Sequence, residues 1–284
     1  MPAVDLPDEA PGGRRGAAWW FAFRERDLLV TSDEDGAIAL PLVGDPAEIG
    51  VVAVRHQFLG TMGGRACWSA ELPADVDAPV GMAFEGLRAL HARLPDAAYA
   101  VAGRAAQIVE WDRTHQFCGR CGVPTERVPG ERAKRCPTCG LTSYPRLSPA
   151  VIVLIRREGE AGPEVPLVRG QHFAAGFYGL VAGFVEPGES LEEAVRREVA
   201  EEVGIELTDV CYFGSQPWPY PHALMVGFTA VHASGDLRLD PREIADAAWF
   251  TPDRFPQIPP PPSIARHLID AFVAKHETST PSRP

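Results

Sequence analysis

The segment from Gly183 to Ile205 constrains the fold most, because it combines helix signals with acidic residues at helical spacing. Ser190, followed three residues later by Glu193, is a capping box that opens a helix. Gly204 is a typical residue at the end of a helix, because it adopts a left-handed backbone conformation easily. Together these signals predict a helix from Leu191 to Val203.

Three carboxylates of this predicted helix lie beside its apolar stripe. At about 100° per residue, Glu198 and Glu202 fall at the edge of the stripe formed by Leu191, Val195, Val199 and Val203, and Glu201 lies close by. A solvated acidic face is the ordinary alternative for a Glu-rich helix. Like charges beside a core are costly, however, unless a cation pairs with them. The pattern therefore predicts Mg²⁺ bound together with the phosphate oxygens of a nucleotide.

The whole segment resembles the Nudix box, Gly-x5-Glu-x7-Arg-Glu-aliphatic-x-Glu-Glu-x-Gly-aliphatic, at every fixed position. The resemblance implies a mixed sheet between helices, with the box as a loop–helix–loop that binds Mg²⁺ or Mn²⁺. It also implies hydrolysis of nucleoside diphosphates linked to another moiety. Glu201 would be a ligand or the base that activates water, and Glu189 would pair with Arg197 to hold the loop on the helix. By motif position, the metal ligands would include Glu198, Glu202 and the main-chain carbonyl of Ala182.

Length and composition limit the remaining possibilities. The 284 residues are enough for two domains, and 45% hydrophobic residues supply the cores. The net charge of −11 disfavours generic binding to polyanions. The longest aliphatic run, from Ala150 to Ile155, is too short to span a bilayer, and the N-terminal residues lack the apolar core of a signal peptide. We therefore expect a cytoplasmic protein with no membrane partner, and a buried strand at 150–155.

Four of the six cysteines form two pairs, Cys118/Cys121 and Cys136/Cys139, separated by 14 residues. Two Cys-x-x-Cys knuckles at this spacing indicate a structural zinc ribbon. Two disulfides would suit an oxidising compartment, and a redox motif would need only one pair. We expect His115 to be no ligand, and Cys67 and Cys211 to be buried thiols.

The ribbon segment is locally basic, although the chain as a whole is acidic. This excess of three positive charges leaves contact with RNA open. It comes from Arg120, Arg127, Arg132, Lys134 and Arg135 against Glu126 and Glu131.

A run of alternating prolines from Ser215 to Pro221 forms a second motif. Alternating prolines stiffen the backbone in an extended form, so Trp218 and Tyr220 could stack a nucleobase. The alternative is a rigid connection filled by aromatic side chains.

The box, the four-cysteine ribbon and the proline run resemble the NADH pyrophosphatase branch of the Nudix superfamily, whose signature reads Ser-Gln-Pro-Trp-Pro-Phe-Pro-x-Ser. The resemblance implies cleavage of NAD(H) to AMP and nicotinamide mononucleotide, and removal of NAD caps from RNA 5′ ends. It also implies a homodimer whose active sites take residues from both chains. Glu243 would be a further metal ligand. The implied substrate contacts are Arg88, Glu131, Tyr144, Gln216, Pro217, Trp218, Pro219, Tyr220, Pro221, His222, Ala223 and Ala265.

Two positions depart from this signature: Tyr220 replaces Phe and Ala223 replaces Ser. The lost hydroxyl at Ala223 removes a possible hydrogen bond worth about 0.5 to 1.5 kcal/mol. The preference among NADH, NAD and capped RNA therefore stays open. One alternative function is hydrolysis of another nucleoside diphosphate derivative, such as ADP-ribose. Another is RNA binding through the ribbon with an inactive Nudix domain, but the complete carboxylate set argues against it.

The expected fold class is α/β (α+β), a Nudix sandwich with a zinc ribbon and a small β-rich N-terminal domain. Within the N-terminal domain we expect strands between 19 and 70 and helices near 82–94 and 96–115, and we find no internal repeat in the sequence. Another helix is expected from Ser263. The expected domains are a disordered tail at 1–16, an NADH-pyrophosphatase-like domain at 17–115, the ribbon at 116–145, the Nudix domain at 146–276 and a disordered tail at 277–284.

Overall fold

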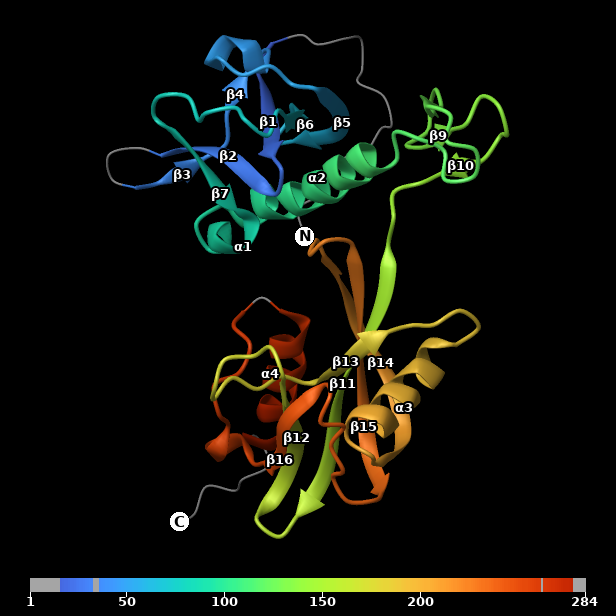
Figure 1. Cartoon of the computed structure of the whole chain (residues 1–284). Helices are drawn as coiled ribbons and strands as arrows, with labels where there is room; N and C mark the ends of the chain where they lie inside the picture. Colours follow the sequence, from blue (N-terminus) through green and yellow to red (C-terminus); the bar gives the residue numbers. More distant parts are fainter. Residues whose placement is uncertain (1–15, 33–35, 262, 278–284) are drawn as a thin grey trace. The chain divides into compact units, whose positions relative to one another are not determined.

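The computed structural model describes residues 16–32, 36–261 and 263–277 (Figure 1). Apart from Gly16 and Glu277, the expected terminal tails lie outside the described residues. The chain divides into two compact units. The first comprises Met1–Arg146 with Pro219–His222, and the second comprises Leu147–Trp218 with Ala223–Pro284.

The first unit contains a seven-stranded sheet, a long helix and the zinc ribbon. Parallel pairing of β1 with β6 places these two strands side by side within the sheet. Helix α2 packs on the sheet through Val101, Ala105 and Ile108, which lie in the core of this unit. The sheet strands are β1 (Ala18–Arg24), β2 (Asp27–Ser32), β3 (Ile38–Ala39), β4 (Leu42–Val43), β5 (Arg55–Met62), β6 (Arg65–Leu72) and β7 (Met82–Gly86). The helices are η1 (Pro46–Ile49), α1 (Leu87–Leu90) and α2 (Asp96–Thr114), and the ribbon strands are β8 (Glu126–Arg127), β9 (Lys134–Arg135) and β10 (Thr142–Ser143).

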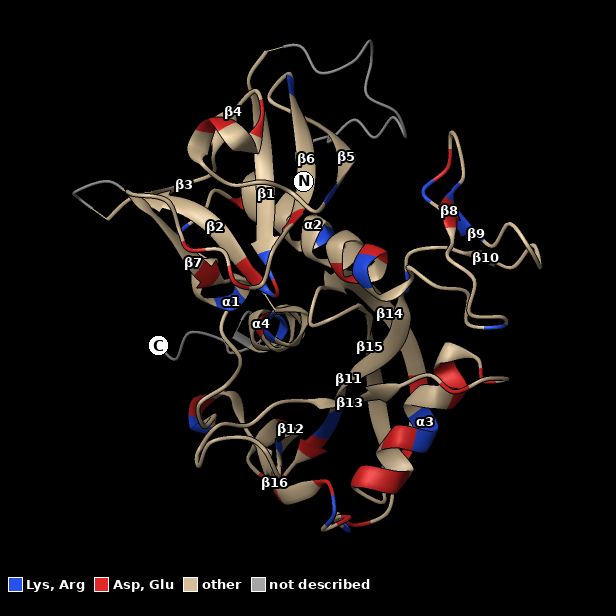
Figure 2. Cartoon of the chain, turned by 45° about the horizontal axis from the view of Figure 1, so that its top comes forward, with Lys and Arg blue, Asp and Glu red and all other residues tan. Residues whose placement is uncertain are grey.

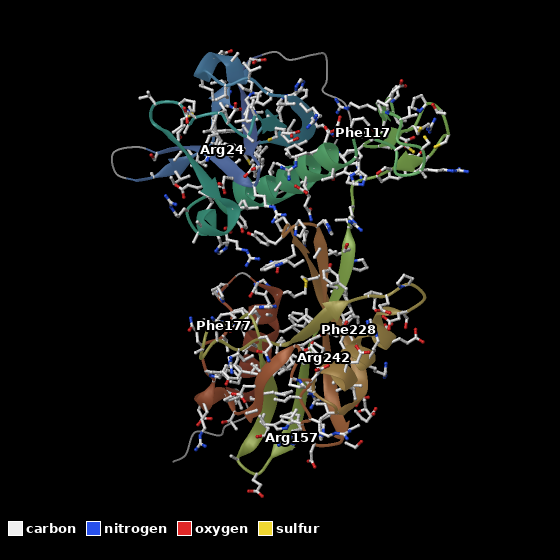
Figure 3. All side chains as sticks on the ribbon, viewed as in Figure 1. Arg24, Phe117, Arg157, Phe177, Phe228 and Arg242 are labelled. Carbon is white, nitrogen blue, oxygen red and sulfur yellow. The ribbon has the colours of Figure 1, made fainter. Side chains whose placement is uncertain are left out.

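The second unit is a six-stranded mixed sheet with a helix on each face (Figure 1). Alternate residues of β11 point to opposite faces. Val153 therefore shares a core with Val199 of α3, while Leu154 shares another with Leu268 of α4. Phe228 of β15, labelled in Figure 3, is buried in the α3 core. The elements are β11 (Ser148–Gly159), β12 (Gly162–Gly170), β13 (Val181–Phe184), α3 (Leu191–Glu202), β14 (Glu206–Trp218), β15 (Ala223–Ser234), β16 (Ile244–Phe250), η2 (Pro252–Arg254) and α4 (Ile264–Glu277).

The two units repeat one strand topology, although the sequence shows no repeat. The second unit has the order β14-β15-β11-β12-β16, with β13 paired to β11. The first unit has the matching order β5-β6-β1-β2-β7, with β4 paired to β1, and its central pair is again parallel. The connections between equivalent strands differ: α3 joins β13 to β14, whereas the four-residue η1 joins β4 to β5. The first unit is therefore a Nudix-like fold without the long helix of the box.

Most local expectations agree with these elements. Residues 150–155 lie in β11, the helix expected at 191–203 is α3, and the helix expected from Ser263 is α4. Of the helix expected at 82–94, only Leu87–Leu90 is helical: residues 82–86 pair with β2 as strand β7, and residues 91–94 form a turn. The proline run is extended only as far as Trp218. Within the described residues, no helix is both long and apolar enough to cross a membrane.

Candidate active site and zinc site

Helix α3 begins and ends at the residues that the sequence indicates. Ser190 and Glu193 form the capping box, in which the backbone N–H of Ser190 donates to Glu193 Oε2 at 2.8 Å. After the helix, Gly204 has a φ of 71°, and its N–H donates to the carbonyl of Val199 at 3.0 Å. These two ends fix the helix position along the chain, and with it the direction of each glutamate.

Glu198 and Glu202 lie on the buried side of α3, with exposed fractions of 8% and 7%. Glu198 packs against the backbone of Gly183 in β13. A Cβ atom at Gly183 would lie 2.0 to 2.2 Å from the Glu198 carboxyl atoms, far inside any contact distance. The Glu198 carboxylate can therefore keep this position only while residue 183 carries no side chain.

Arg197 holds the preceding loop on α3. Its guanidinium donates to both Glu189 oxygens, at 2.5 and 2.9 Å, which confirms the expected pair. It also donates to Glu198 at 2.9 Å, Glu201 at 3.1 Å and the carbonyl of Phe184 at 2.9 Å. The hydrogen bonds from Arg197 lower the pKa of Glu189 to about 2. Arg197 thus connects the loop, strand β13 and two box glutamates, and Figure 2 shows the acidic and basic residues gathered on α3.

Burial and neighbouring negative charges raise the pKa of two carboxylates of the site, Glu198 and Glu202. Burial raises the pKa of Glu202 to about 8, assisted by the negative charges of Glu198, Glu243 and Glu201. Burial also raises the pKa of Glu198, although Arg197 opposes the shift. Glu243 lies just before β16, and the preceding turn is fixed to the helix because Asp240 N–H donates to the Glu202 carbonyl at 3.1 Å. Glu201 is more exposed, at 60% of its side chain.

This donor set fits a hard divalent cation. Two mostly buried carboxylates, Glu198 and Glu202, repel each other and Glu243, and Arg197 offsets this repulsion only at Glu198. Mg²⁺ and Mn²⁺ prefer oxygen ligands, above all carboxylates and carbonyls. Glu198 and Glu243 lie near enough to Glu202 for their charges to raise its pKa, and metal binding by the three stays a prediction.

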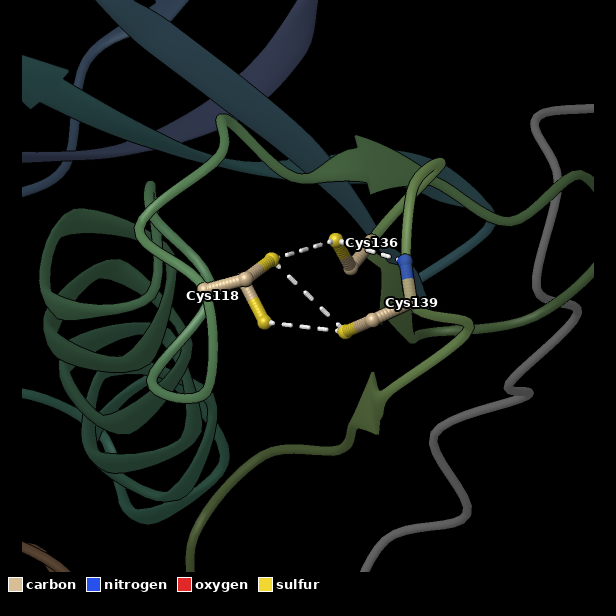
Figure 4. A group of neighbouring side chains, drawn as sticks. Cys118, Cys136 and Cys139 are labelled. Carbon is tan, nitrogen blue, oxygen red and sulfur yellow. Dashed lines mark hydrogen bonds between the residues drawn. The ribbon is translucent and has the colours of Figure 1, made fainter.

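The four ribbon cysteines form a site whose dimensions fit zinc (Figure 4). Their sulfur atoms lie 3.4 Å (121 to 136), 3.5 Å (118 to 139) and 3.7 Å (121 to 139) apart. A tetrahedral site with Zn–S bonds of about 2.3 Å requires separations of roughly 3.8 Å. Backbone N–H groups, above all that of Cys139, lower the pKa of Cys136 to about 6, which favours the thiolate that zinc binds.

The two knuckles have the same turn geometry. Gly122 N–H donates to the Cys118 carbonyl at 2.9 Å, and Gly140 N–H donates to the Cys136 carbonyl at 3.0 Å. Both glycines have positive φ, 73° and 75°, which other residues adopt at a cost. His115 is outside the group of four cysteines, and its Nδ1 lies 3.0 Å from the Trp111 carbonyl oxygen.

A buried residue of α2, Asp112, attaches the ribbon to the rest of the first unit. Its carboxylate forms an ion pair with Lys134 of β9 and accepts a hydrogen bond from Gln57 of β5 at 2.6 Å. Lys134 also donates to the Asp112 carbonyl at 2.7 Å. Burial opposes ionisation of Asp112, but the hydrogen bonds from Lys134 and Gln57 prevail and lower its pKa.

Comparison with known proteins identifies the family. The sequence matches the family models of an NADH pyrophosphatase-like rudimentary NUDIX domain at 17–111, an NADH pyrophosphatase zinc ribbon domain at 113–144 and a NUDIX domain at 146–272. The NAD-capped RNA hydrolase NudC of Deinococcus radiodurans is 44% identical over 271 residues, which cover 95% of this chain and 93% of that protein. The chain belongs to the NADH pyrophosphatase branch of the Nudix hydrolases.

A second curated relative agrees with this assignment. NudC of Pseudomonas fluorescens, also named NAD-capped RNA hydrolase, is 46% identical over 279 residues. The matched region covers 95% of this chain and 93% of that protein. A solved Nudix hydrolase from Nitrosomonas europaea is 20% identical and covers 60% of this chain and 96% of its own, with a TM-score of 0.49. In the present chain, the match to the rudimentary NUDIX domain lies in the first unit, where η1 stands in the place of the box helix.

Several residues that the branch signature predicts for substrate binding lie in the first unit. Tyr220 is half-buried; its hydroxyl lies 2.8 Å from that of Tyr99, and the Arg88 guanidinium lies 4.1 Å from its ring centre. Pro219 packs on α2, where a Cβ at Gly103 would lie 3.2 Å from its Cγ. For Tyr220 these contacts favour the alternative of a rigid, aromatic-filled connection over an open stacking surface.

The ribbon contains two further residues that are predicted to contact substrate, Glu131 and Tyr144. The Tyr144 hydroxyl donates to Glu131 Oε2 at 3.2 Å, and both side chains are exposed. The structure thus brings Glu131 and Tyr144 together, as neighbours in space that are 13 residues apart in the chain.

The remaining predicted substrate residues are placed around the proline run. Gln216 Oε1 accepts a hydrogen bond from the Ile264 N–H at 2.8 Å, which places it at the start of α4 beside the buried Ala265. Trp218 pairs with Ala223 across the β14–β15 hairpin. Pro217 and Pro221 are exposed, and His222 is half-buried.

Two features depart from the sequence analysis or escaped it. Cys67 is buried, as expected, but Cys211 is exposed on β14, so its assignment as a buried thiol is wrong. Sequence reasoning also missed the partnership of Asp112 with Lys134 and Gln57, because these residues are far apart in the chain. The available signal was the position of Asp112 in the apolar stripe of α2, in line with Val101, Ala105 and Ile108.

Proposed function

We propose that this Nudix hydrolase cleaves the pyrophosphate bond of NADH and NAD to AMP and nicotinamide mononucleotide, and removes NAD caps from RNA 5′ ends. The observation that carries the proposal is the buried pair Glu198 and Glu202, held by Gly183 and Arg197 beside Glu243. The substrate class is supported by the relatives named NAD-capped RNA hydrolase, which match almost the full length of the chain.

The catalytic cation is proposed to be Mg²⁺ or Mn²⁺, held by Glu198, Glu202, Glu243 and the carbonyl of Ala182. When bound, it would neutralise charge on the diphosphate and make a bound water more acidic. Glu201 is proposed as the base that receives the proton from water, because its exposed carboxylate can reach solvent. Arg197 positions Glu201 and Glu198 relative to the loop through its hydrogen bonds to both.

Substrate contacts are proposed at the residues that the resemblance to the branch indicates. They are Arg88, Glu131, Tyr144, Gln216, Pro217, Trp218, Pro219, Tyr220, Pro221, His222, Ala223 and Ala265. A homodimer in the cytoplasm, with active sites built from both chains, is part of the proposal. We propose the same domain limits as above, 17–115, 116–145 and 146–276.

The proposed function is tested by incubating the purified chain with Mg²⁺ or Mn²⁺ and equal concentrations of NADH, NAD, ADP-ribose and NAD-capped RNA. The products are separated by chromatography. AMP and nicotinamide mononucleotide are expected from NADH or NAD, and these products should be lost in Glu202→Gln. Glu192→Gln, on the exposed side of the same helix, is the matched control and should retain activity.

Other outcomes would assign a different function. Turnover of ADP-ribose alone would point to another nucleoside diphosphate derivative as substrate. Binding of RNA without any turnover would indicate an RNA-binding protein with an inactive Nudix domain. Light scattering at several protein concentrations tests the dimer separately.

A further inference from the structure

A cavity of about 300 Å³ lies between the sheet of the second unit and the C-terminal half of α4. Its floor comes from alternate residues of neighbouring strands, which share one face of the sheet. Arg156 of β11 and Phe213 of β14 lie on this floor, and Phe272 and Lys275 of α4 form the opposite wall. The cavity thus lies within a single unit of the protein.

This cavity is separate from the carboxylate site. Leu154 lines the cavity and shares a core with α4, whereas its neighbour Val153 shares a core with α3. The cavity and the catalytic helix therefore lie on opposite faces of the sheet. Gln216 contacts the first residue of α4, while Lys275 is 11 residues further along, roughly 16 Å at the rise of an α-helix. None of the predicted substrate residues lines the cavity.

The charges around the cavity favour an anion. Two cations, Arg156 and Lys275, line it together with a single acid, Asp209, and His276 adds ring nitrogens that can form hydrogen bonds. No ion pair engages the Arg156 guanidinium within the part of the chain that the structure describes. A phosphomonoester carries about −1.5 to −2 charges at neutral pH, whereas a carboxylate carries one. The planar guanidinium also matches two phosphate oxygens at once.

The size and the apolar walls limit the rest of the ligand. Ligand cavities range from roughly 300 to 1,000 Å³, so this one suits a single small molecule rather than a dinucleotide or a polymer. Phe213, which is 39% exposed, and the buried Phe272 contribute aromatic surface on the sheet side and the helix side. Aromatic side chains favour a planar ring as their neighbour.

We propose that this cavity binds a small aromatic organic phosphate of the size of a nucleoside monophosphate. The phosphate contacts Arg156 and Lys275, and the ring lies against Phe213 and Phe272. AMP is the probe of choice. That AMP is also a product of this enzyme rests on the proposed function. The proposal that the cavity binds AMP does not depend on that function.

Cys211 provides a built-in reporter, because it lines the cavity and is exposed. Cys67 is buried, and the other four cysteines form the zinc site. The rate at which a coloured disulfide reagent modifies the zinc-loaded full chain is measured with and without AMP. At an AMP concentration of ten times its Kd, occupancy slows the modification of Cys211 roughly tenfold. Cys211→Ser identifies the part of the signal that belongs to this thiol.

Two charge variants and two smaller probes complete the test. Arg156→Gln and Lys275→Gln should each weaken the protection by AMP while leaving NADH hydrolysis in the absence of AMP unchanged. Adenosine alone and inorganic phosphate alone should protect much less than AMP. Equal modification rates with and without AMP overturn the proposal, as does equal protection by adenosine or by phosphate, or full protection in both variants. Protection by AMP in a chain that fails to hydrolyse NADH would reject only the proposed function.

Discussion

The carboxyl group of Glu198 occupies the space that a side chain at Gly183 would need. The two residues belong to different elements, β13 and α3, and their contact sets the separation between strand and helix at the carboxylate site. We therefore expect Gly183→Ala to displace Glu198 and lower metal affinity and kcat by about 10- to 100-fold, the usual effect of disturbing residues that orient ligands. Steady-state kinetics at varied Mn²⁺ concentration measure both quantities. Gly214→Ala is the matched control, because a Cβ there meets nothing within 4 Å; equal activity of the two variants would contradict the prediction.

Arg197→Lys should impair catalysis although it keeps the charge. A lysine cannot reproduce the simultaneous hydrogen bonds to Glu189, Glu198 and the Phe184 carbonyl, because it lacks the planar guanidinium. We expect kcat to fall about 10- to 100-fold. Arg196→Lys, whose side chain donates only to the Glu192 carbonyl of the same helix, should remain close to wild type. A similar loss in both variants would show that the network around Arg197 has no special role.

Glu201→Gln should lower kcat with little change in KM, because the side chain is exposed and is proposed to accept a proton rather than to bind substrate. A loss of about 10²- to 10⁴-fold is typical when a general base is removed. Measurement of kcat and KM between pH 6 and about 9 covers the range in which enzymic bases operate. Wild-type kcat throughout would exclude Glu201 as the base.

Lys134→Met should destabilise the first unit by about 3 to 5 kcal/mol, because it leaves the buried Asp112 carboxylate without its cation. Urea unfolding measures the change. The double variant Asp112→Leu/Lys134→Met should recover much of the loss, since a buried ion pair can be replaced by apolar residues. Arg113→Met removes a partly exposed ion pair with Glu110 and should cost about 0 to 1 kcal/mol.

The same pair gives a pH dependence with a defined sign. The folded-state pKa of Asp112 lies below the ordinary aspartate value of 3.8. Its contribution to stability is therefore fully present above pH 3.8, and it is lost as the pH falls through the folded-state value. Wild type should lose stability in this acid range, and the double variant should lose less of it. Parallel acid profiles for the two proteins would show that Asp112 does not contribute.

Removal of zinc should first lower the stability of the fold, and any loss of activity should follow from that. Structural zinc contributes apparent binding energies of about 10 to 16 kcal/mol in small peptides, comparable to the stability of a domain. Cys136→Ser should lose bound zinc and lower Tm, as measured by metal analysis and circular dichroism. Cys211→Ser is the matched control, because its thiol is outside the zinc cluster. Unchanged Tm after zinc loss would contradict the prediction.

Local signals predicted the elements of the catalytic helix, whereas contacts between distant residues escaped prediction. The capping box, Gly204 and the spacing of Glu198 and Glu202 all lie within one short segment, so the sequence is sufficient for α3. Strand β7 forms because Met82–Gly86 pairs with β2, some fifty residues earlier, and this pairing overrides the local helical pattern. The contact of Arg88 with Tyr220 likewise depends on the tertiary fold.

The topological repeat escaped prediction for a different reason. Strand order is set by which backbones pair, and many sequences satisfy the same alternation of apolar residues. The first unit retains the pairing of the second but replaces the twelve-residue α3 with the four-residue η1. The feature that would make the similarity visible in the sequence, the box itself, is therefore present only once.

Asp112 has a consequence for recombining this protein with its relatives. The match to the rudimentary domain ends at 111, and the match to the zinc ribbon begins at 113. The apparent junction therefore falls on Asp112, which contacts Gln57 in the N-terminal domain and Lys134 in the ribbon. A chimera joined there would inherit Asp112 from one parent and either Lys134 or Gln57 from the other. The ribbon and the N-terminal domain should therefore be exchanged together, so that Gln57, Asp112 and Lys134 all come from the same parent protein.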